Sequence, residues 1–216
     1  FFKQATELDP NYARAHAWRE CSLANYQSWD KEVAGGNWVE ECTKSVTRAL
    51  ELDPDEAEAH RIMGSIKMIR KDFQSARYHH EKAKDLCPSD AYIAAKYATA
   101  LIYMSEPEKA LDEIKRAMRL DPFCPDILFE DEGIINFCME DFENAINSFK
   151  KLKVPTKNSL FYSAASYSKL RKTQEAQETL ERAINLTGET IEQFLNGQNY
   201  EKPEPIQRLN NALTAI

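Results

Sequence analysis

Small and apolar side chains recur along the chain at helical spacing, and prolines interrupt them at near-regular intervals. Four times a leucine precedes an Asp-Pro or Cys-Pro pair, ending at Pro10, Pro54, Pro88 and Pro122, and the last three prolines are 34 residues apart. An alanine stands five residues before each of these prolines. Proline lacks an N–H and disfavours helix at the residue before it. The pattern therefore predicts helices that end at the prolines and a structural unit of 34 residues.

Small residues also stand where two helices of one unit would cross, as with Gly64 and Ala76 or with Ala98 and Ala110. They allow antiparallel helices to approach closely, while larger apolar residues fill the gaps around them. A period of 34 with this arrangement is typical of the tetratricopeptide repeat, a helix–turn–helix unit. The chain thus resembles tetratricopeptide-repeat proteins. The resemblance implies an all-α fold, a solenoid of about five helix pairs in a right-handed superhelix with a C-terminal capping helix.

We expect a single tetratricopeptide-repeat domain over residues 1–216. Residues 1–10 match the end of a helix whose start is missing, so the chain is expected to be a piece of a longer protein. The remaining segments are a long first repeat at 13–54, repeats at 57–88, 91–122, 125–155 and 157–188, and C-terminal helices at 189–216.

Two of these repeats are irregular. The first is about ten residues too long, with a helix expected at 11–29, two adjacent glycines in a loop at 34–37, and a second helix at 38–52. The apolar positions of its first helix are Trp18, Leu23, Tyr26 and Trp29. The repeat at 125–155 fits the pattern only with one extra residue in its first helix.

The layout resembles one group of tetratricopeptide-repeat proteins more closely. The segment FKQATELDPNYARA at 2–15, the over-long first repeat, and a tail with YEKP at 200–203 and QRL at 207–209 carry this resemblance. It is to the C-terminal repeat region of bacterial class III adenylate/guanylate cyclase-type signalling proteins, and similar regions follow winged-helix transcriptional regulators. The resemblance implies a regulatory region whose cyclase domain lies outside this chain.

Composition narrows the function classes. The net charge is −7, from 28 Lys and Arg against 35 Asp and Glu, so a phosphate backbone or an anionic membrane surface would be repelled. Nucleic acid and membrane are therefore not expected as partners. Only six glycines occur, too few for a Gly-rich phosphate loop. The five cysteines form no Cys-x-x-Cys pair, which favours free thiols, mostly buried, in a cytoplasmic protein.

Candidate chemistry is sparse. His79 and His80 are neighbours on a predicted helix and point about 100° apart, so they cannot chelate one ion, and His80 is expected to pack in the core. His16 and His60 occupy equivalent positions in two repeats and are expected to be structural. The acidic residues between 126 and 143 spread around two helices, as on a solvated face. We therefore expect no enzyme activity, no cofactor and no metal.

The expected binding surface is the concave groove, because the first helix of each repeat lines it in this class. Positions two, five, nine and twelve of a repeat face inward. They are Glu58, Arg61, Ser65 and Met68; Tyr92, Ala95, Thr99 and Ile102; Asp126 or Ile127, Phe129 or Glu130, Ile134 and Phe137; and Asn158, Phe161, Ala165 and Ser168.

We therefore expect a non-catalytic protein-interaction or regulatory module that binds a protein or peptide in this groove. The acidic stretch 126–132 favours a basic ligand. Arg61 is the only basic residue at these positions, so a clamp for a chaperone's C-terminal carboxylate is not expected. The alternative is a scaffold that dimerises its parent, either as part of a winged-helix regulator or as a stand-alone repeat protein.

Overall fold

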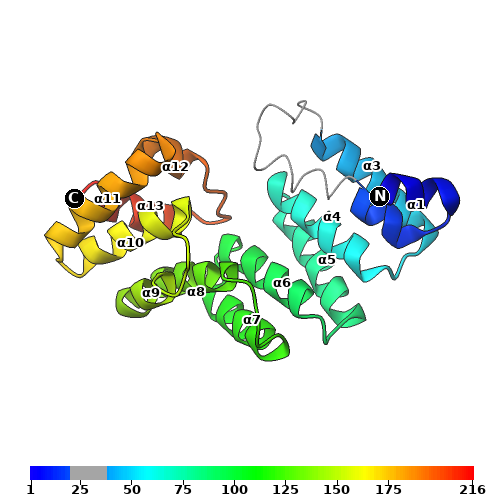
Figure 1. The fold of residues 1–216 in the computed structure, drawn as a ribbon, viewed down its shortest axis with the longest axis horizontal. Coiled ribbons are helices and arrows are strands. Elements are labelled where there is room, and N and C mark those ends of the chain that lie inside the picture. The colour runs from blue at the N-terminus through cyan, green and yellow to red at the C-terminus, as the bar shows by residue number, and fades with distance from the viewer. Residues whose placement is uncertain (20–37) are drawn as a thin grey trace. The chain divides into compact units, whose positions relative to one another are not determined.

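The computed structural model describes residues 1–19 and 38–216, and the described residues form helices and turns without any strand (Figure 1). The predicted all-α class is confirmed. The chain divides into two compact units, unit 1 (Phe1–Tyr97) and unit 2 (Ala98–Ile216). The predictions for Cys21, Leu23, Tyr26, Trp29 and the loop at 34–37 lie outside the described residues.

Both units are built from consecutive helices. In unit 1 these are α1 (Phe2–Leu8), a helical stretch at 13–19, α3 (Trp38–Leu52), α4 (Ala57–Ile69), α5 (Phe73–Leu86) and the first part of α6 (Ala91–Tyr103). In unit 2 they are the rest of α6, α7 (Pro107–Leu120), α8 (Ile127–Cys138), α9 (Phe142–Phe149), α10 (Lys157–Lys169), α11 (Thr173–Thr187), α12 (Ile191–Asn196) and α13 (Glu204–Leu213).

The small residues predicted at the helix crossings are buried. Ala76, Ala98 and Ala110 have no exposed surface, and Gly64 is also buried. A β-carbon on Gly64 would lie 2.7 Å from Cδ2 of His80, so only glycine lets this ring fill the crossing of α4 and α5. In unit 2, Gly133 of α8 meets the ring of Phe149 of α9 in the same way.

The aspartate of the Asp-Pro pairs has a second structural role. Its carboxylate accepts a hydrogen bond from the backbone N–H two residues later, which forms an Asx turn between consecutive helix pairs. The pairs are Asp9 with Asn11, Asp53 with Asp55, and Asp121 with Phe123, over 2.9–3.0 Å. Proline thus ends one helix while aspartate shapes the turn into the next.

Turns within a helix pair share one backbone feature. Lys71, Ser105, Glu140 and Arg171 each follow a first helix with a φ of 58–64°, in the left-handed region. Residues with a β-carbon are strained there. Each residue allows the chain to reverse within three residues, so that the second helix returns along the first.

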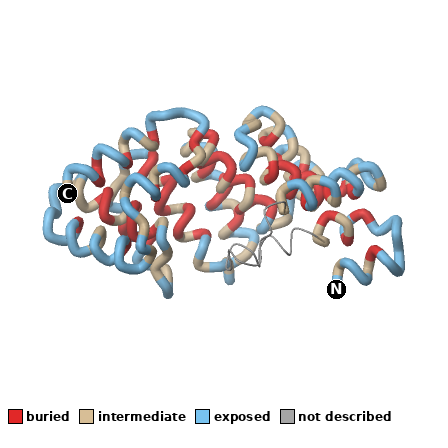
Figure 2. Tube along the Cα trace, turned by 90° about the horizontal axis from the view of Figure 1, so that it is seen from above, coloured by how far each residue is buried: buried red, intermediate tan, exposed pale blue. Residues whose placement is uncertain are grey.

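Figure 2 shows buried and exposed stretches alternating along the helices, as expected for helices with one packed side. In unit 1 the core between α3 and α4 contains Val46, Ile62 and Ile66. In unit 2 the rings of Phe137 and Tyr162 pack edge to face, with 5.1 Å between centroids. Of the cysteines in the described residues, Cys42 and Cys138 are buried whereas Cys87 and Cys124 are half-buried. The expectation of mostly buried thiols therefore holds for only half of them.

Candidate functional site

The predicted groove residues of unit 1 meet around one arginine. Nε of Arg61 donates a hydrogen bond to Glu58 Oε2 over 2.8 Å. The guanidinium carbon lies 4.8 Å from the ring centroid of Tyr92 and 5.3 Å from that of Trp18, and Lys96 Nζ lies 5.3 Å from the ring of Tyr92. We call Trp18, Glu58, Arg61, Tyr92 and Lys96 the Arg61 cluster. It joins the helical stretch at 13–19 to α4 and α6.

The Arg61 cluster combines a buried cation with an exposed ring. Arg61 is 3% exposed, whereas Tyr92 is 41% exposed. Two cation–π contacts and an ion pair hold the guanidinium, and these interactions gain strength where water is excluded. Tyr92 is thereby fixed in position with part of its ring in solvent. A positioned, partly exposed aromatic ring is the kind of side chain that carries binding energy in protein interfaces.

The other predicted groove residues of unit 1 lie farther along α4 and α6. Ser65 and Met68 of α4 are half-buried, and the Ser65 hydroxyl donates to the carbonyl of Arg61 over 3.3 Å. Ala95 of α6 is buried. The structure therefore presents Tyr92, with Met68 and Ser65, as the accessible part of the predicted surface.

The acidic residues of unit 2 have partners within the protein. The Thr99 hydroxyl donates to Asp131 Oδ2 over 2.7 Å. Glu130 accepts hydrogen bonds from the Thr156 hydroxyl and from Asn158 Nδ2. Both carboxylates are buried, with Glu130 4% and Asp131 8% exposed. The expectation of a solvated acidic face is therefore wrong for these two residues, because donors from neighbouring helices enclose them.

The remaining acidic residues of this stretch are nearer the surface and are also paired. Asp126 accepts from the backbone N–H of Lys153 over 3.2 Å and lies 3.5 Å from its Nζ. Glu132 pairs with Lys151 at 3.0 Å, and Lys151 lies 5.0 Å from the ring centroid of Phe129. These contacts leave the acidic stretch a weak basis for selecting a basic ligand.

Five predicted groove residues of unit 2 belong to its packed interior, namely Ile102, Ile134, Phe137, Phe161 and Ala165. Ile102 is 1% exposed. Phe161 has no exposed surface, and its ring stacks on that of Phe194 from α12, with 4.0 Å between centroids. Helix α12 therefore covers the predicted surface at Phe161.

The histidines form a packing arrangement between α4 and α5. Nδ1 of His60 lies 2.9 Å from Nδ1 of His79, and Nε2 of His60 lies 2.9 Å from the carbonyl of Pro54. Because the carbonyl only accepts, His60 carries its proton on Nε2 and accepts from His79 on Nδ1. His16 makes the equivalent contact with the carbonyl of Pro10. Both histidines fix the turn that precedes their helix.

His80 fills the core as predicted, since it is 1% exposed and stacks on Tyr97. Burial, with Arg61 nearby, lowers the pKa of His80 to about 3. Burial, with His60 nearby, lowers the pKa of His79 to about 4. Both rings are therefore neutral at neutral pH. Residues 1–19 and 38–216 hold no group of three or more His, Cys, Asp or Glu side chains that could bind a metal ion.

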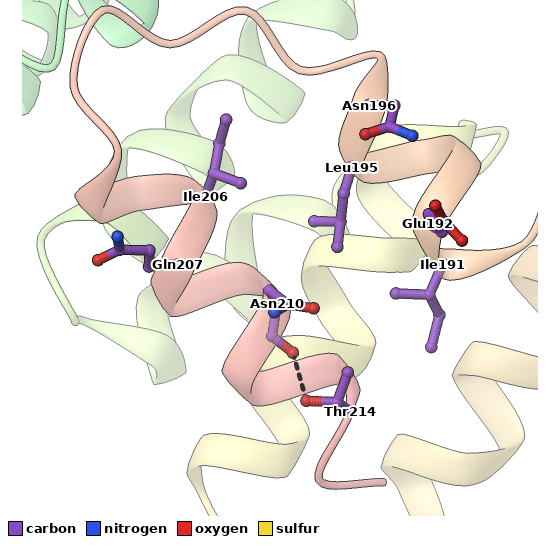
Figure 3. Close-up of a pocket in the computed structure, with 8 residues that line it drawn as sticks. All are labelled: Ile191, Glu192, Leu195, Asn196, Ile206, Gln207, Asn210 and Thr214. Carbon is purple, nitrogen blue, oxygen red and sulfur yellow. Dashed lines mark hydrogen bonds between the residues drawn. The ribbon is translucent and has the colours of Figure 1, made fainter.

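A pocket of about 440 Å³ lies between α12 and α13 (Figure 3). Ile191, Leu195 and Ile206 give it an apolar lining. The polar lining residues are Glu192, Asn196, Gln207, Asn210 and Thr214. The Thr214 hydroxyl donates to the carbonyl of Asn210 over 2.8 Å. Sequence reasoning missed this pocket, because its lining comes from two short helices outside the repeat pattern.

Comparison with known proteins identifies the repeat type of the fold. The model of the tetratricopeptide repeat matches residues 163–190, which cover much of α10 and α11. The structure of Pseudomonas aeruginosa PilF is 17% identical and superposes with a TM-score of 0.67, over 94% of this chain and 88% of that one. This chain has a tetratricopeptide-repeat fold.

Two further solved structures have the same tetratricopeptide-repeat architecture. PilW, a type IV pilus biogenesis factor, is 18% identical with a TM-score of 0.66, over 89% of this chain and 86% of that one. YrrB, a tetratricopeptide-repeat protein with an unusual peptide-binding site, is 20% identical with a TM-score of 0.54, over 88% of this chain and 94% of that one. No curated protein matches the sequence. Among the described helices, none has both the length and the apolar character needed to cross a membrane.

Proposed function

We propose that the protein is a non-catalytic interaction module that binds a peptide or protein segment on the tetratricopeptide-repeat surface of unit 1. The observation that carries the proposal is Tyr92, a 41% exposed ring held by the buried Arg61. The ligand would lay an apolar or aromatic side chain on this ring and extend along α4 toward Ser65 and Met68. Extended binding surfaces on first helices are the usual product of a repeat solenoid.

The test compares two exposed tyrosines of unit 1. Tyr92→Ala removes the proposed contact, whereas Tyr78→Ala removes a 59% exposed ring from the second helix α5. Partners captured from the source organism are quantified by mass spectrometry and their affinity is then measured. We expect Tyr92→Ala to weaken binding by at least about 1 kcal/mol, or about fivefold, and Tyr78→Ala to leave it unchanged. Equal binding by both variants would refute this surface.

We further propose that the module serves a larger bacterial, cytoplasmic signalling protein of the adenylate/guanylate cyclase type. The long first repeat and the tail at 200–209 support this parentage. The coding sequence upstream of Phe1 tests it directly. A cyclase domain in the same reading frame is the expected result, and an unrelated domain would refute the proposal.

A dimerisation role is the second candidate, favoured by exposed apolar side chains on unit 2. Phe123 is 94% and Val154 75% exposed, and both lie in turns between helix pairs. Light scattering after size exclusion measures the mass of the protein. A dimer that Phe123→Ser and Val154→Ser convert to a monomer would favour this role over ligand binding.

A further inference from the structure

The C-terminal segment of the chain, from the start of α12 to the end of α13 (residues 191–213), lies against the first helices of unit 2. α13 packs on α10, the first helix of its pair (Figure 1). Phe194 of α12 stacks on Phe161 of the same helix, with the two rings 11° from parallel. The segment thus covers the side of α10 on which the repeat pattern places binding residues.

Four hydrogen bonds tie this segment to the ends of two other first helices and to the turns that follow them. The backbone N–H of Glu201 donates to the carbonyl of Tyr103 over 2.7 Å, at the end of α6. Nη1 of Arg208 donates to the carbonyl of Cys138 over 2.6 Å, at the end of α8. The last carbonyls of a helix have no donor within the helix and attract positive charge. The segment therefore satisfies two helix ends at once.

The other two ties use residues with left-handed backbone. The backbone N–H of Lys202 donates to the hydroxyl of Ser105 over 3.4 Å, and Nη2 of Arg208 donates to Glu140 Oε1 over 2.7 Å. Ser105 has a φ of 58° and Glu140 a φ of 64°. The turn after α6 and the turn after α8 thus each provide a side chain that hydrogen-bonds to the segment.

An aromatic side chain anchors the middle of the segment. Tyr200 is 8% exposed, and its hydroxyl lies 2.7 Å from that of Tyr162 on α10. The same hydroxyl lies 3.8 Å from Sγ of Cys138 on α8. Phe194, Tyr200 and Arg208 together give the segment a ligand-like pattern of two rings and a cation, at intervals of six and eight residues.

We propose that residues 194–208 are a built-in ligand of the first-helix surface of unit 2, and that this surface also accepts a separate peptide of the same chemistry. Residues 197–203 have no helix of their own, and the pocket of Figure 3 lies between α12 and α13. The rings of Phe194 and Tyr200 and the side chain of Arg208 hold the segment to the surface that it covers. It opens as a unit, while α8 and α10 stay folded, and closes a second binding site until a partner displaces it.

Hydrogen exchange on the full chain tests the opening step. Arg208→Gln removes the two cationic hydrogen bonds, and Arg182→Gln on the exposed side of α11 is the matched control. We expect amides of 198–213 to exchange about tenfold faster in Arg208→Gln, with those of α8 and α10 unchanged. If amides of 198–213 and α10 exchange at one common rate in both variants, the segment opens only by unfolding of unit 2, and the proposal fails.

Binding of a labelled synthetic peptide with the sequence of residues 190–213 tests the surface itself. Arg208→Gln and a second variant, Tyr200→Phe, both weaken the built-in ligand and keep its rings. We expect each to bind the peptide at least about tenfold more tightly than the unaltered chain does. A peptide with alanine at 194, 200 and 208 should not bind.

Equal binding of both peptides, or no binding to variants whose segment has opened, would overturn the proposal. Tyr92→Ala separates this site from the proposed surface of unit 1. It should leave binding of the synthetic peptide unchanged, because Tyr92 belongs to unit 1.

Discussion

Nδ1 of His79 donates a hydrogen bond to Nδ1 of His60 over 2.9 Å, and this bond links α5 to α4. The bond requires that the acceptor nitrogen of His60 carry no proton. Burial, with His60 nearby, lowers the pKa of His79 to about 4, so the donor ring is also neutral near neutral pH. The neighbouring His80 is buried against Gly64, with neither ring nitrogen hydrogen-bonded in the described residues. The packing of unit 1 therefore depends on neutral imidazoles.

This dependence predicts acid sensitivity. The folded-state pKa is about 4 for His79 and about 3 for His80, below the ordinary value of about 6.5. Between these values the unfolded chain binds protons that the folded chain excludes, so the free energy of unfolding falls as the pH is lowered from about 6.5 toward 4. Each histidine contributes at most about 1.4 kcal/mol per pH unit.

Urea unfolding at several pH values measures the effect. His80→Leu cannot take up a proton, so its stability should fall less steeply with decreasing pH than that of the unaltered chain. Arg182→Gln, a surface change on α11, gives the baseline. Identical slopes for His80→Leu and the unaltered chain would show that the ring does not resist protonation in the folded state.

Gly133 provides a test of helix packing in unit 2. A β-carbon there would lie 2.3 Å from Cε1 of Phe149, a distance that requires the ring or the helix to move. Gly133→Ala should therefore lower the free energy of unfolding by about 1–3 kcal/mol. Phe149→Leu in the same chain should make the alanine less costly, because the smaller side chain leaves room. If the two changes are simply additive in chemical denaturation, the close approach is not the cause.

The left-handed turns predict that some glycine substitutions stabilise the fold. Arg171 is exposed and has a φ of 58°, a conformation that costs about 1–2 kcal/mol for a residue with a β-carbon. Glycine avoids this cost but loses about 0.5–1 kcal/mol in backbone entropy. Arg171→Gly should therefore stabilise the chain by about 0.5–1 kcal/mol.

Two matched changes control this prediction. Arg182→Gly places the same substitution within α11 and should cost about 1 kcal/mol. Gly188→Ala, at a φ of 68° after α11, should cost about 1 kcal/mol although nothing lies within 4 Å of the new methyl group. A loss of stability in Arg171→Gly comparable with that of Arg182→Gly would contradict the assigned turn.

The repeat pattern made the fold predictable because its constraints are local. A small residue at a crossing and a proline at a helix end each act on neighbouring residues, as Ala76 and Pro54 show. The Asx turns could also have been read from the recurring Asp before proline. Positional rules likewise brought Glu58, Arg61 and Tyr92 together.

The accessibility of the other predicted groove residues depends on residues that lie outside the repeat pattern. Phe161 occupies a binding position, but Phe194 covers it from a short helix that the 34-residue period does not describe. The pattern of α8 alone predicts that Glu130 is solvated. It is buried because Thr156 and Asn158, at the start of α10, donate hydrogen bonds to it. The burial of Phe161 and Glu130 comes from contacts with other helices, and the pattern of residues along one helix does not predict these contacts.

Tyr92 and Phe161 should consequently behave differently when replaced by alanine, although the repeat pattern places both on the groove side of a first helix. Phe161 has no exposed surface and stacks on Phe194, so Phe161→Ala leaves a cavity and should cost about 3–5 kcal/mol of stability. Tyr92 is 41% exposed, so Tyr92→Ala should cost much less stability and act mainly on ligand binding. Chemical denaturation and partner affinity, measured on both variants, separate the two effects. A Phe161→Ala protein as stable as the unaltered chain would show that the C-terminal helices do not pack on α10, and the proposed built-in ligand would be lost with that contact.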